Sequence, residues 1–414
     1  MLNFEKILSF YNKSKNDTDE NILKAMRKDG IYNATFNQSV IDNTKNTFNV
    51  ELPEVKIYNQ DESYSCWIYA YISFIKPSIC KNLNIYDEDL DISVNYIHFF
   101  DRLEKSNSLY EEIINNNLTF ENSINEDLVN QYIHTCGAFD NAKDIIKKYG
   151  IVPENEMPMN RNNFEPFVVD KIFKEKVKKD ISEILKLDDI NEKYRFKEKC
   201  LEENYILLSR VFGRPPVKFD FKYKDINKKE VKFESISPKQ FLDICITDNL
   251  DDYIFVMNDD SKEFYKQYEY NDFKQIYNNK HYFYNLPLDV IKQSITEQLK
   301  NGIPVWFGCD FRAVCGSYTN KPGILDSNLF CLKEVLGIEI LPKSEQIKFN
   351  SNNYHHAMII VGVQIENNKP IRWKVQNSFG KENNQDGYFV MNENYFNEYA
   401  TMFGINKKYI NSSK

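Results

Sequence analysis

Two apolar segments near the C-terminus, separated by a short polar turn, constrain the fold more than any other feature of the sequence. Residues 357–363 read AMIIVGV, a continuous apolar run that is typical of a strand buried on both faces. Residues 371–377 read IRWKVQN, in which apolar and polar side chains alternate as they do in a strand with one buried face. The polar turn at residues 366–370 predicts that the two strands form an antiparallel hairpin.

This hairpin predicts a contact between its two open ends. His356 precedes the first strand and Asn377 ends the second, so the returning strand brings the amide close to the imidazole. The two-residue period also places Asn377 on the apolar side of its strand, where an amide without a partner is costly. We therefore expect Asn377 to have a specific hydrogen bond and to lie near His356.

A cysteine is predicted to begin a helix in the N-terminal third. Residues 67–74 read WIYAYISF, and their apolar side chains include a stripe at intervals of three and four residues. This stripe predicts a helix that begins near Cys66 and ends before Pro77. A thiol at a helix N-terminus beside a protonated imidazole has a lowered pKa, which favours the nucleophilic thiolate.

These residue types suit acyl transfer through a thiolate. Cys66 would attack a carbonyl, His356 would accept the thiol proton and deliver it to the leaving amine, and Asn377 would orient the imidazole. Gln60 could donate a side-chain N–H to the oxyanion alongside the backbone N–H of Cys66. The hypothesis is a cysteine peptidase that needs no metal and no organic cofactor.

Each of these residues also has a simpler interpretation. An isolated cysteine is more often a small buried apolar residue, a histidine that begins a buried strand is more often a structural residue, and Asn377 could cap a loop. His355 and His356 are a poor pair of metal ligands, because neighbouring residues of a strand point to opposite faces. The catalytic hypothesis depends on all four residues occurring together in the expected helix and strand contexts.

Composition limits the class of protein. The chain has 414 residues, 42% of them hydrophobic and 28% charged, as in a soluble globular protein. The absence of a signal peptide and of an apolar run near the roughly 18 residues that span a bilayer predicts a cytoplasmic protein without a membrane partner. The net charge of -8 argues against nucleic acid as the main partner, although a local basic channel for it remains an alternative. The cysteines lack CxxC pairs and are expected to be free thiols: Cys66, Cys80, Cys136, Cys200, Cys245, Cys309, Cys315 and Cys331.

The pattern predicts an α+β fold in three parts. Residues 1–135 form an N-terminal segment and a helical subdomain with the Cys66 helix. Residues 136–285 form a mainly helical middle section, in which residues 170–187 are an amphipathic helix. Residues 286–414 form a β subdomain that carries His356 and Asn377.

The motifs around these residues resemble those of the papain superfamily, and more closely those of the bleomycin hydrolase and aminopeptidase C family. The resemblance covers nearly the whole chain. The matching segments are Asn59-Gln60 and residues 65–70, 210–216, 236–238, 256–259, 304–310, 356–358, 377–380 and 386–388.

The resemblance implies a papain-like core, with a helical subdomain and an antiparallel β subdomain, and it implies that residues 136–285 form a cleft segment and a large, mainly helical insertion. It implies a cytoplasmic cysteine aminopeptidase that acts on short or unfolded peptides and assembles as a homohexamer with active sites facing an internal cavity. Cys66, His356 and Asn377 match the catalytic triad of the family, and Gln60 matches its oxyanion donor.

Three departures from the family pattern affect the expected cleft. Tyr64-Ser65 replaces the usual Gly-Arg and is expected to narrow the approach to the nucleophile. Phe379 replaces a tryptophan that covers the His–Asn hydrogen bond, so the bond is expected to keep a smaller cover. Cys136-Gly137 replaces the Gly-Gly that lines the substrate cleft, and the Cys136 side chain is expected to crowd a bound peptide.

A fourth departure concerns the C-terminus. In the family a C-terminal arm places its terminal carboxylate against the free amino group of the substrate. This chain ends at Lys414, soon after the last recognisable segment at residues 395–399, so the arm is expected to be missing. Endopeptidase or di- and tripeptide-releasing activity is therefore one alternative to aminopeptidase activity, and a catalytically weak oligomeric scaffold is another.

Overall fold

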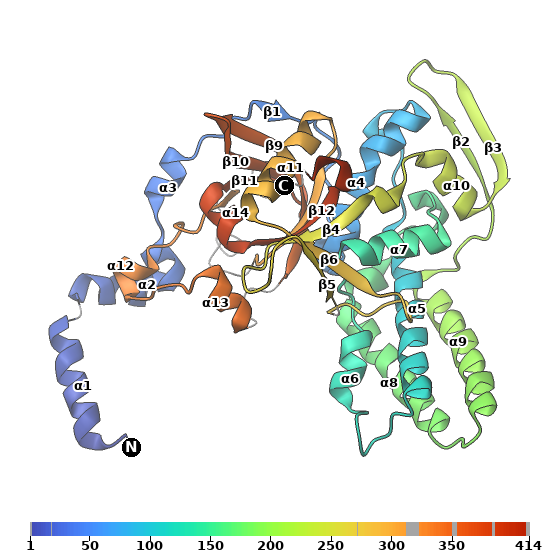
Figure 1. The fold of residues 1–414 in the computed structure, drawn as a ribbon, viewed down its shortest axis with the longest axis horizontal. Helices are drawn as coiled ribbons and strands as arrows, with labels where there is room; N and C mark the ends of the chain where they lie inside the picture. Colours follow the sequence, from blue (N-terminus) through green and yellow to red (C-terminus); the bar gives the residue numbers. More distant parts are fainter. Residues whose placement is uncertain are drawn as a thin grey trace.

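The chain adopts an α+β fold, as predicted. A computed structural model describes residues 2–17, 19–270, 272–311, 323–349, 354–382 and 386–410. A twisted sheet occupies the centre of the molecule, a group of helices lies on one side of it, and an N-terminal arm extends on the other side (Figure 1).

The helices and strands are numbered in chain order. The helices are α1 (Phe4–Asp17), α2 (Glu20–Thr35), α3 (Gln38–Asn43), α4 (Cys66–Leu83), α5 (Val94–Asn115), α6 (Glu126–Tyr132), α7 (Phe139–Tyr149), α8 (Pro166–Ile184), α9 (Ile190–Phe212), α10 (Pro238–Cys245), α11 (Leu288–Lys300), α12 (Leu332–Leu336), α13 (Lys343–Lys348) and α14 (Glu393–Tyr399). The strands are β1 (Val50–Glu51), β2 (Phe219–Lys224), β3 (Glu230–Ile236), β4 (Tyr253–Met257), β5 (Lys266–Tyr270), β6 (His281–Asn285), β7 (Val305–Cys309), β8 (Ile324–Leu325), β9 (His356–Glu366), β10 (Lys369–Gln376), β11 (Tyr388–Asn392) and β12 (Ala400–Asn406).

Strand β9 is the central element of the mixed sheet. The strand order is β5-β6-β4-β12-β7-β9-β10-β11-β8, and β1 pairs with the far end of β9. Alternate residues of β9 enter two different cores: Ala357 and Ile359 pack on the side of α4, whereas Met358 and Ile360 pack on the side of α11 and α14. The prediction of a strand buried on both faces is therefore confirmed.

The predicted hairpin is also confirmed. Strands β9 and β10 pair antiparallel, with Glu366 opposite Lys369. The two turn residues, Asn367 and Asn368, both have positive φ, of 50° and 63°. Two consecutive positive φ values are the mark of a type I′ turn, which asparagine tolerates and which matches the twist of a hairpin.

Helix α4 begins at Cys66, as predicted, but the predicted end before Pro77 is wrong, because the helix continues to Leu83. Pro77 cannot donate the backbone hydrogen bond to the fourth residue before it, which normally weakens a helix. Here Ile79 and Leu83, beyond the proline, are completely or almost completely buried. Burial of their side chains offsets the missing bond, and Asn84 then ends the helix in a left-handed conformation.

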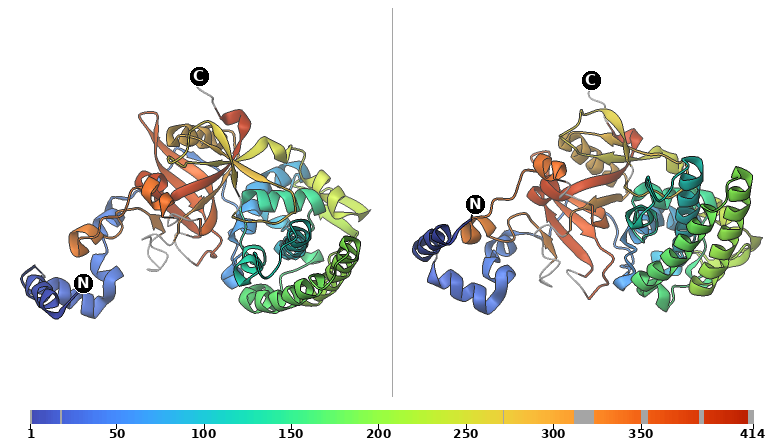
Figure 2. Two further views of the ribbon diagram at one scale, coloured as in Figure 1. Left: turned by 60° about the horizontal axis from the view of Figure 1, so that its bottom comes forward. Right: turned by 90° about the horizontal axis from the view of Figure 1, so that it is seen from below.

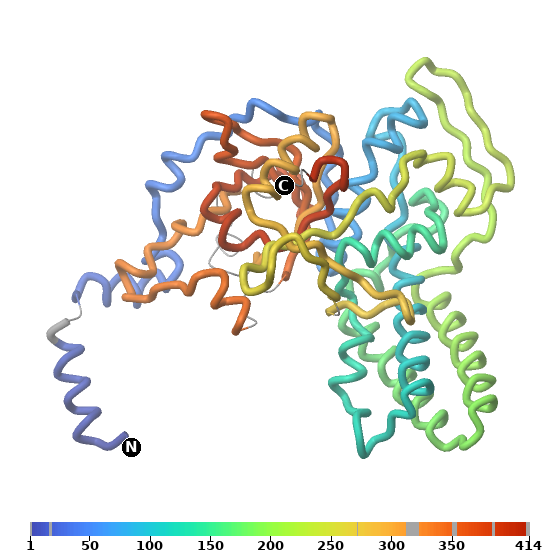
Figure 3. Tube along the Cα trace, in the orientation of Figure 1, coloured from blue at the N-terminus to red at the C-terminus, as the bar shows by residue number. Residues whose placement is uncertain are grey.

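The middle of the chain is helical but not only helical. The amphipathic helix predicted at residues 170–187 is α8, whose apolar face is buried as expected. The same part of the chain also contributes β4, β5 and β6, which extend the central sheet. The trace in Figure 3 follows the chain from the arm through β1, at the edge of the sheet, to α4, which packs on β9.

Two further expectations concern membranes and cysteines. Among the described residues, no helix has the length and apolar character needed to cross a bilayer. The seven cysteines within the described ranges form no disulfide, and Cys315 lies outside those ranges.

Candidate active site

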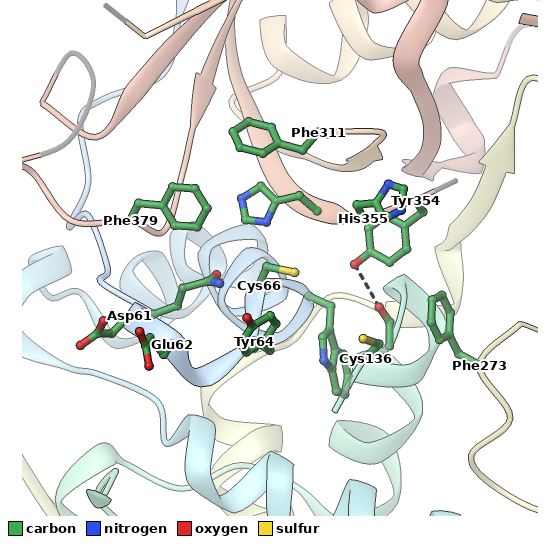
Figure 4. A pocket seen from close by; sticks show the side chains of 14 residues that line it. Asp61, Glu62, Tyr64, Cys66, Cys136, Phe273, Phe311, Tyr354, His355 and Phe379 are labelled. Atoms are coloured by element: carbon green, nitrogen blue, oxygen red, sulfur yellow. Dashed lines mark hydrogen bonds between the residues drawn. The ribbon is translucent and has the colours of Figure 1, made fainter. Parts of the chain in front are cut away.

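The predicted site residues come together at a cavity of about 390 Å³ where α4 meets the sheet. Gln60, Cys66, Cys136, Gly137 and His356 all line it. Figure 4 shows the cavity, with Asp61 and Glu62 at one end and Phe273 at the other. Asn377 is not part of the lining, because it lies behind His356 and is almost completely buried.

The hydrogen bonds of Asn377 fix the protonation of His356. The backbone N–H of Ser378 donates to Asn377 Oδ1 over 2.8 Å, and a backbone N–H can only donate. The atom facing His356 is the same oxygen, at 2.7 Å from Nε2. Nε2 must therefore carry the proton, which leaves Nδ1 as the unprotonated nitrogen that can act as a base.

Two aromatic rings cover this imidazole. Phe379 stacks on His356 with ring centres 4.8 Å apart, and Phe311 contacts the same ring at 4.9 Å. Apolar rings on the imidazole exclude water, which strengthens the hydrogen bond to Asn377. Phe379 thus supplies the smaller cover that the sequence predicted.

Cys66 is the first residue of α4, and its sulfur points toward the Tyr354 hydroxyl (Figure 4). Burial raises the pKa of the thiol to about 11, and the interactions of the sulfur with the Ala357 N–H and the Tyr354 hydroxyl oppose this rise. Burial lowers the pKa of His356 to about 4, and its bond to Asn377 opposes that shift. Each charge is thus disfavoured alone, whereas a thiolate and an imidazolium formed together attract each other and offset the loss of solvation.

Gln60 is oriented by the residue that orients Asn377. The hydroxyl of Ser378 donates to Gln60 Oε1 over 2.7 Å, and the backbone N–H of Gln60 donates to the Ser378 carbonyl. With its oxygen committed to Ser378, the amide has its two N–H groups left for other partners, and Gln60 lines the cavity beside Cys66. This arrangement can present a donor to a negatively charged oxygen in the cavity.

A buried lysine holds the wall formed by residues 134–137. Lys105 Nζ donates to the carbonyls of His134 and Cys136, each at 2.8 Å, and pairs with Asp101 at 2.9 Å. The indole N–H of Trp67 donates to the Thr135 carbonyl. The three consecutive carbonyls of residues 134–136 are therefore held by hydrogen bonds. These bonds fix the backbone, so that the next residue, Gly137, faces the cavity.

Gly137 and Cys136 play different parts in this wall. A Cβ on Gly137 would lie 2.8 Å from the Trp67 ring, so packing on the indole requires glycine at this position. Cys136 is exposed and lines the cavity, and the crowding of a bound peptide by its side chain stays a prediction.

Tyr64 lies beside the approach to Cys66. Its φ is 54°, in the left-handed region that glycine adopts without strain, and its ring contacts Phe167 edge-on at 4.8 Å. Tyr64 lines the cavity, so its ring narrows the approach to the nucleophile.

Ser65 is held by a chain of buried polar groups. Arg102 Nη1 donates to His98 Nδ1 over 3.2 Å, so His98 Nε2 carries the proton and donates to the Ser65 hydroxyl over 2.9 Å. That hydroxyl in turn donates to the Ser63 carbonyl. The chain fixes the backbone that leads into Cys66, and it requires a neutral His98.

Sequence patterns identified some of these residues and missed others. Ser378 belongs to a motif that was recognised, but its links to both amides were not predicted. No local sequence pattern pointed to Lys105, His98 or Tyr354, because each of them acts by contacting residues that are far away in the sequence. His355 points to Asp310, with Nδ1 2.8 Å from the carboxylate, and no cluster of three metal-ligating side chains exists in the part of the chain that the structure describes.

Comparisons with known proteins show the family of the chain. The model of the peptidase C1-like family matches residues 1–414. Aminopeptidase C of Listeria monocytogenes is 30% identical over 99% of this chain and 93% of its own length, and aminopeptidase E of Lactobacillus helveticus is 30% identical over 98% and 93%. The crystal structure of PepW from Lactobacillus rhamnosis HN001 has a TM-score of 0.92 at 28% identity, and the match covers 99% of this chain and 93% of that one.

The neutral state of His98 predicts a loss of stability in acid. Burial and the Arg102 charge hold the pKa of His98 well below 6.5, so below pH 6.5 the unfolded chain binds a proton that the folded chain does not. The free energy of unfolding should therefore fall by roughly 2 kcal/mol for this group between pH 6.5 and about pH 5. Urea unfolding of the unsubstituted protein and of His98→Gln at both pH values measures it, and an equal fall in the two proteins would contradict the assignment.

The paired charges predict how alkylation of Cys66 depends on pH. In His356→Ala no imidazolium can form, so burial should keep the pKa of Cys66 above that of an ordinary thiol, and iodoacetamide should react with it only in alkaline solution. In the unsubstituted protein the thiolate paired with His356 should react below pH 7. Peptide mapping by mass spectrometry separates Cys66 from Cys136, and Cys66→Ala is the control; identical pH profiles with and without His356 would exclude the pair.

Proposed function

The chain belongs to the peptidase C1-like family, and on that premise we propose that it is a cysteine aminopeptidase that removes N-terminal residues from short or unfolded peptides. The observation that carries the proposal is the His356 tautomer. An imidazole with Nε2 bound to Asn377 has its basic nitrogen left for a thiol, and Cys66 lines the same cavity. The relatives named aminopeptidase C and aminopeptidase E support the choice of substrate.

In the proposed reaction, Nδ1 of His356 accepts the Cys66 proton, and the thiolate attacks the carbonyl carbon of the first peptide bond. This step requires the Cys66 side chain to turn from Tyr354 toward the imidazole, a rotation about one bond. The carbonyl oxygen becomes an oxyanion that accepts hydrogen bonds from the Cys66 backbone N–H and from the side-chain amide of Gln60.

Collapse of the tetrahedral intermediate breaks the carbon–nitrogen bond. The imidazolium of His356 donates its proton to the leaving amine, and the N-terminal residue stays bound to Cys66 as a thioester. His356 then removes a proton from a water molecule that attacks the thioester. The carbon–sulfur bond then breaks, the imidazolium returns its proton to the Cys66 sulfur, and the released amino acid loses its carboxyl proton to solvent, so that the thiol and the neutral imidazole are restored. Asn377 holds the ring in one plane through both steps.

The decisive test compares matched peptides with free and acetylated N-termini. The protein should release single residues from the free peptides, should leave the acetylated peptides intact, and should lose all activity in Cys66→Ala. Mass spectrometry of the products measures both results. Equal cleavage of the two peptide sets would replace the aminopeptidase by an endopeptidase, and activity that survives Cys66→Ala would remove the nucleophile.

We also propose that the protein works in the cytoplasm as a homohexamer. The family resemblance supports both points. The arm of α1 and α2 stands apart from the body in both views of Figure 2, and its exposed apolar side chains suit contact with a second copy. These side chains are Leu2, Phe4, Ile7, Leu8, Phe10, Tyr11, Ile31 and Tyr32.

The hexamer predicts a particle six times the 49.1 kDa of one chain. Light scattering after size exclusion measures this mass. Aspartate in place of Phe4 and Leu8 should give smaller particles, because it places charge in an apolar contact, whereas Lys6→Asp, on the same helix, should leave the mass unchanged. A monomeric unsubstituted protein, or an arm variant that stays hexameric, would contradict this assembly.

A further inference from the structure

Tyr354 joins the two walls of the cavity. It lies two residues before His356, and its hydroxyl donates to the carbonyl of Gly137 on the opposite wall over 3.0 Å. Figure 4 shows this bond as a bridge between Cys66 and Phe273. The bridge therefore separates the region around the nucleophile from the far end of the cavity.

The Tyr354 ring is held by packing as well as by this bond. It meets Phe273 edge-on at 5.7 Å and Trp306 at 6.0 Å. It also lies against Gly308, where a Cβ would come within 2.6 Å of the ring. The ring can occupy this place because residue 308 has no side chain, and moving it would break its contacts with the two aromatic rings.

The opposite end of the cavity is open. Asp61 and Glu62 lie on the far side of Cys66 from Tyr354, and both residues are exposed. A peptide that reaches Cys66 through this end extends past the sulfur only as far as the Tyr354 ring.

We propose that Tyr354 sets the length of the released fragment by leaving room for one residue beyond Cys66. The inference rests on the proposed function, because in an aminopeptidase the residue that stays on the sulfur is the N-terminal one, which then occupies the closed end. A second residue there would need the space of the ring. It would also need a backbone partner such as the Gly137 carbonyl, which already accepts the Tyr354 hydroxyl.

The stop for the substrate is then the Tyr354 side chain, which belongs to the cavity wall itself. The substrates are peptides whose N-terminal residue is unmodified and not extended by a blocking group. It also makes Tyr354 a specificity determinant that lies in contact with the nucleophile, since its hydroxyl reaches the Cys66 sulfur. Substitution of Tyr354 therefore affects the rate as well, and the test must compare two substrates within each variant.

The test measures hydrolysis of alanyl-aminomethylcoumarin and of acetyl-alanyl-alanyl-aminomethylcoumarin. The unsubstituted protein should hydrolyse the first and scarcely the second. Tyr354→Ala should raise the ratio of the second rate to the first by about tenfold or more, because the closed end then admits a second residue. Tyr354→Phe is the matched control: it keeps the ring, and its ratio should stay within about threefold of the unsubstituted protein.

Each rate is divided by the concentration of alkylatable Cys66, so that misfolded protein does not count. Tyr354→Val repeats the comparison if the alanine variant fails to fold. An unchanged ratio in the alanine and valine variants, with alanyl hydrolysis intact in the unsubstituted protein, would overturn the stop and leave the aminopeptidase standing. Failure of the unsubstituted protein to hydrolyse the alanyl substrate would overturn the proposed function itself.

Discussion

The backbone N–H of Ser378 sets the polarity of the whole site. It can only donate, so Asn377 must turn its oxygen toward both this group and His356, and the imidazole must carry its proton on Nε2. The hydroxyl of the same serine occupies the oxygen of Gln60. One residue thus decides which nitrogen of the histidine is basic and holds the oxygen of the glutamine, and the Asn377 amide cannot reverse without leaving a buried donor facing the Ser378 N–H.

The hairpin and the start of α4 were predictable from the sequence, whereas the second layer of the site was not. The positions of Cys66, His356 and Asn377 follow from side-chain periods of 3.6 and 2 and from one turn, all of which are local. The wrong end of α4 shows the limit of such rules, because a proline that ends an exposed helix is tolerated where burial continues beyond it. Lys105 and Tyr354 bond to carbonyls 29 to 217 residues away, and no local pattern encodes such partners.

The departures around the nucleophile are accommodated locally. Ser65 stands where the family has arginine, and a buried chain from Arg102 through His98 satisfies its hydroxyl. Tyr64 accepts a left-handed backbone that costs of order 1 kcal/mol and gains an edge contact with Phe167. The backbone that leads into Cys66 is therefore fixed by interactions that the Ser65 hydroxyl and the Tyr64 ring make with neighbouring residues.

The start of β9 delivers three separate features to the cavity. Tyr354, just before the strand, and His356, its first residue, line the cavity, and His355 between them also borders it with its Nδ1 2.8 Å from the Asp310 carboxylate. The next residue, Ala357, directs its backbone N–H to the Cys66 sulfur. The stop (Tyr354), the base (His356) and a donor to the thiolate (the Ala357 N–H) therefore lie on one backbone segment and move as one unit. Strand β9 pairs with β7 and β10 and is buried on both faces, so this unit is held as firmly as the core, and a change in its register would remove all three features together.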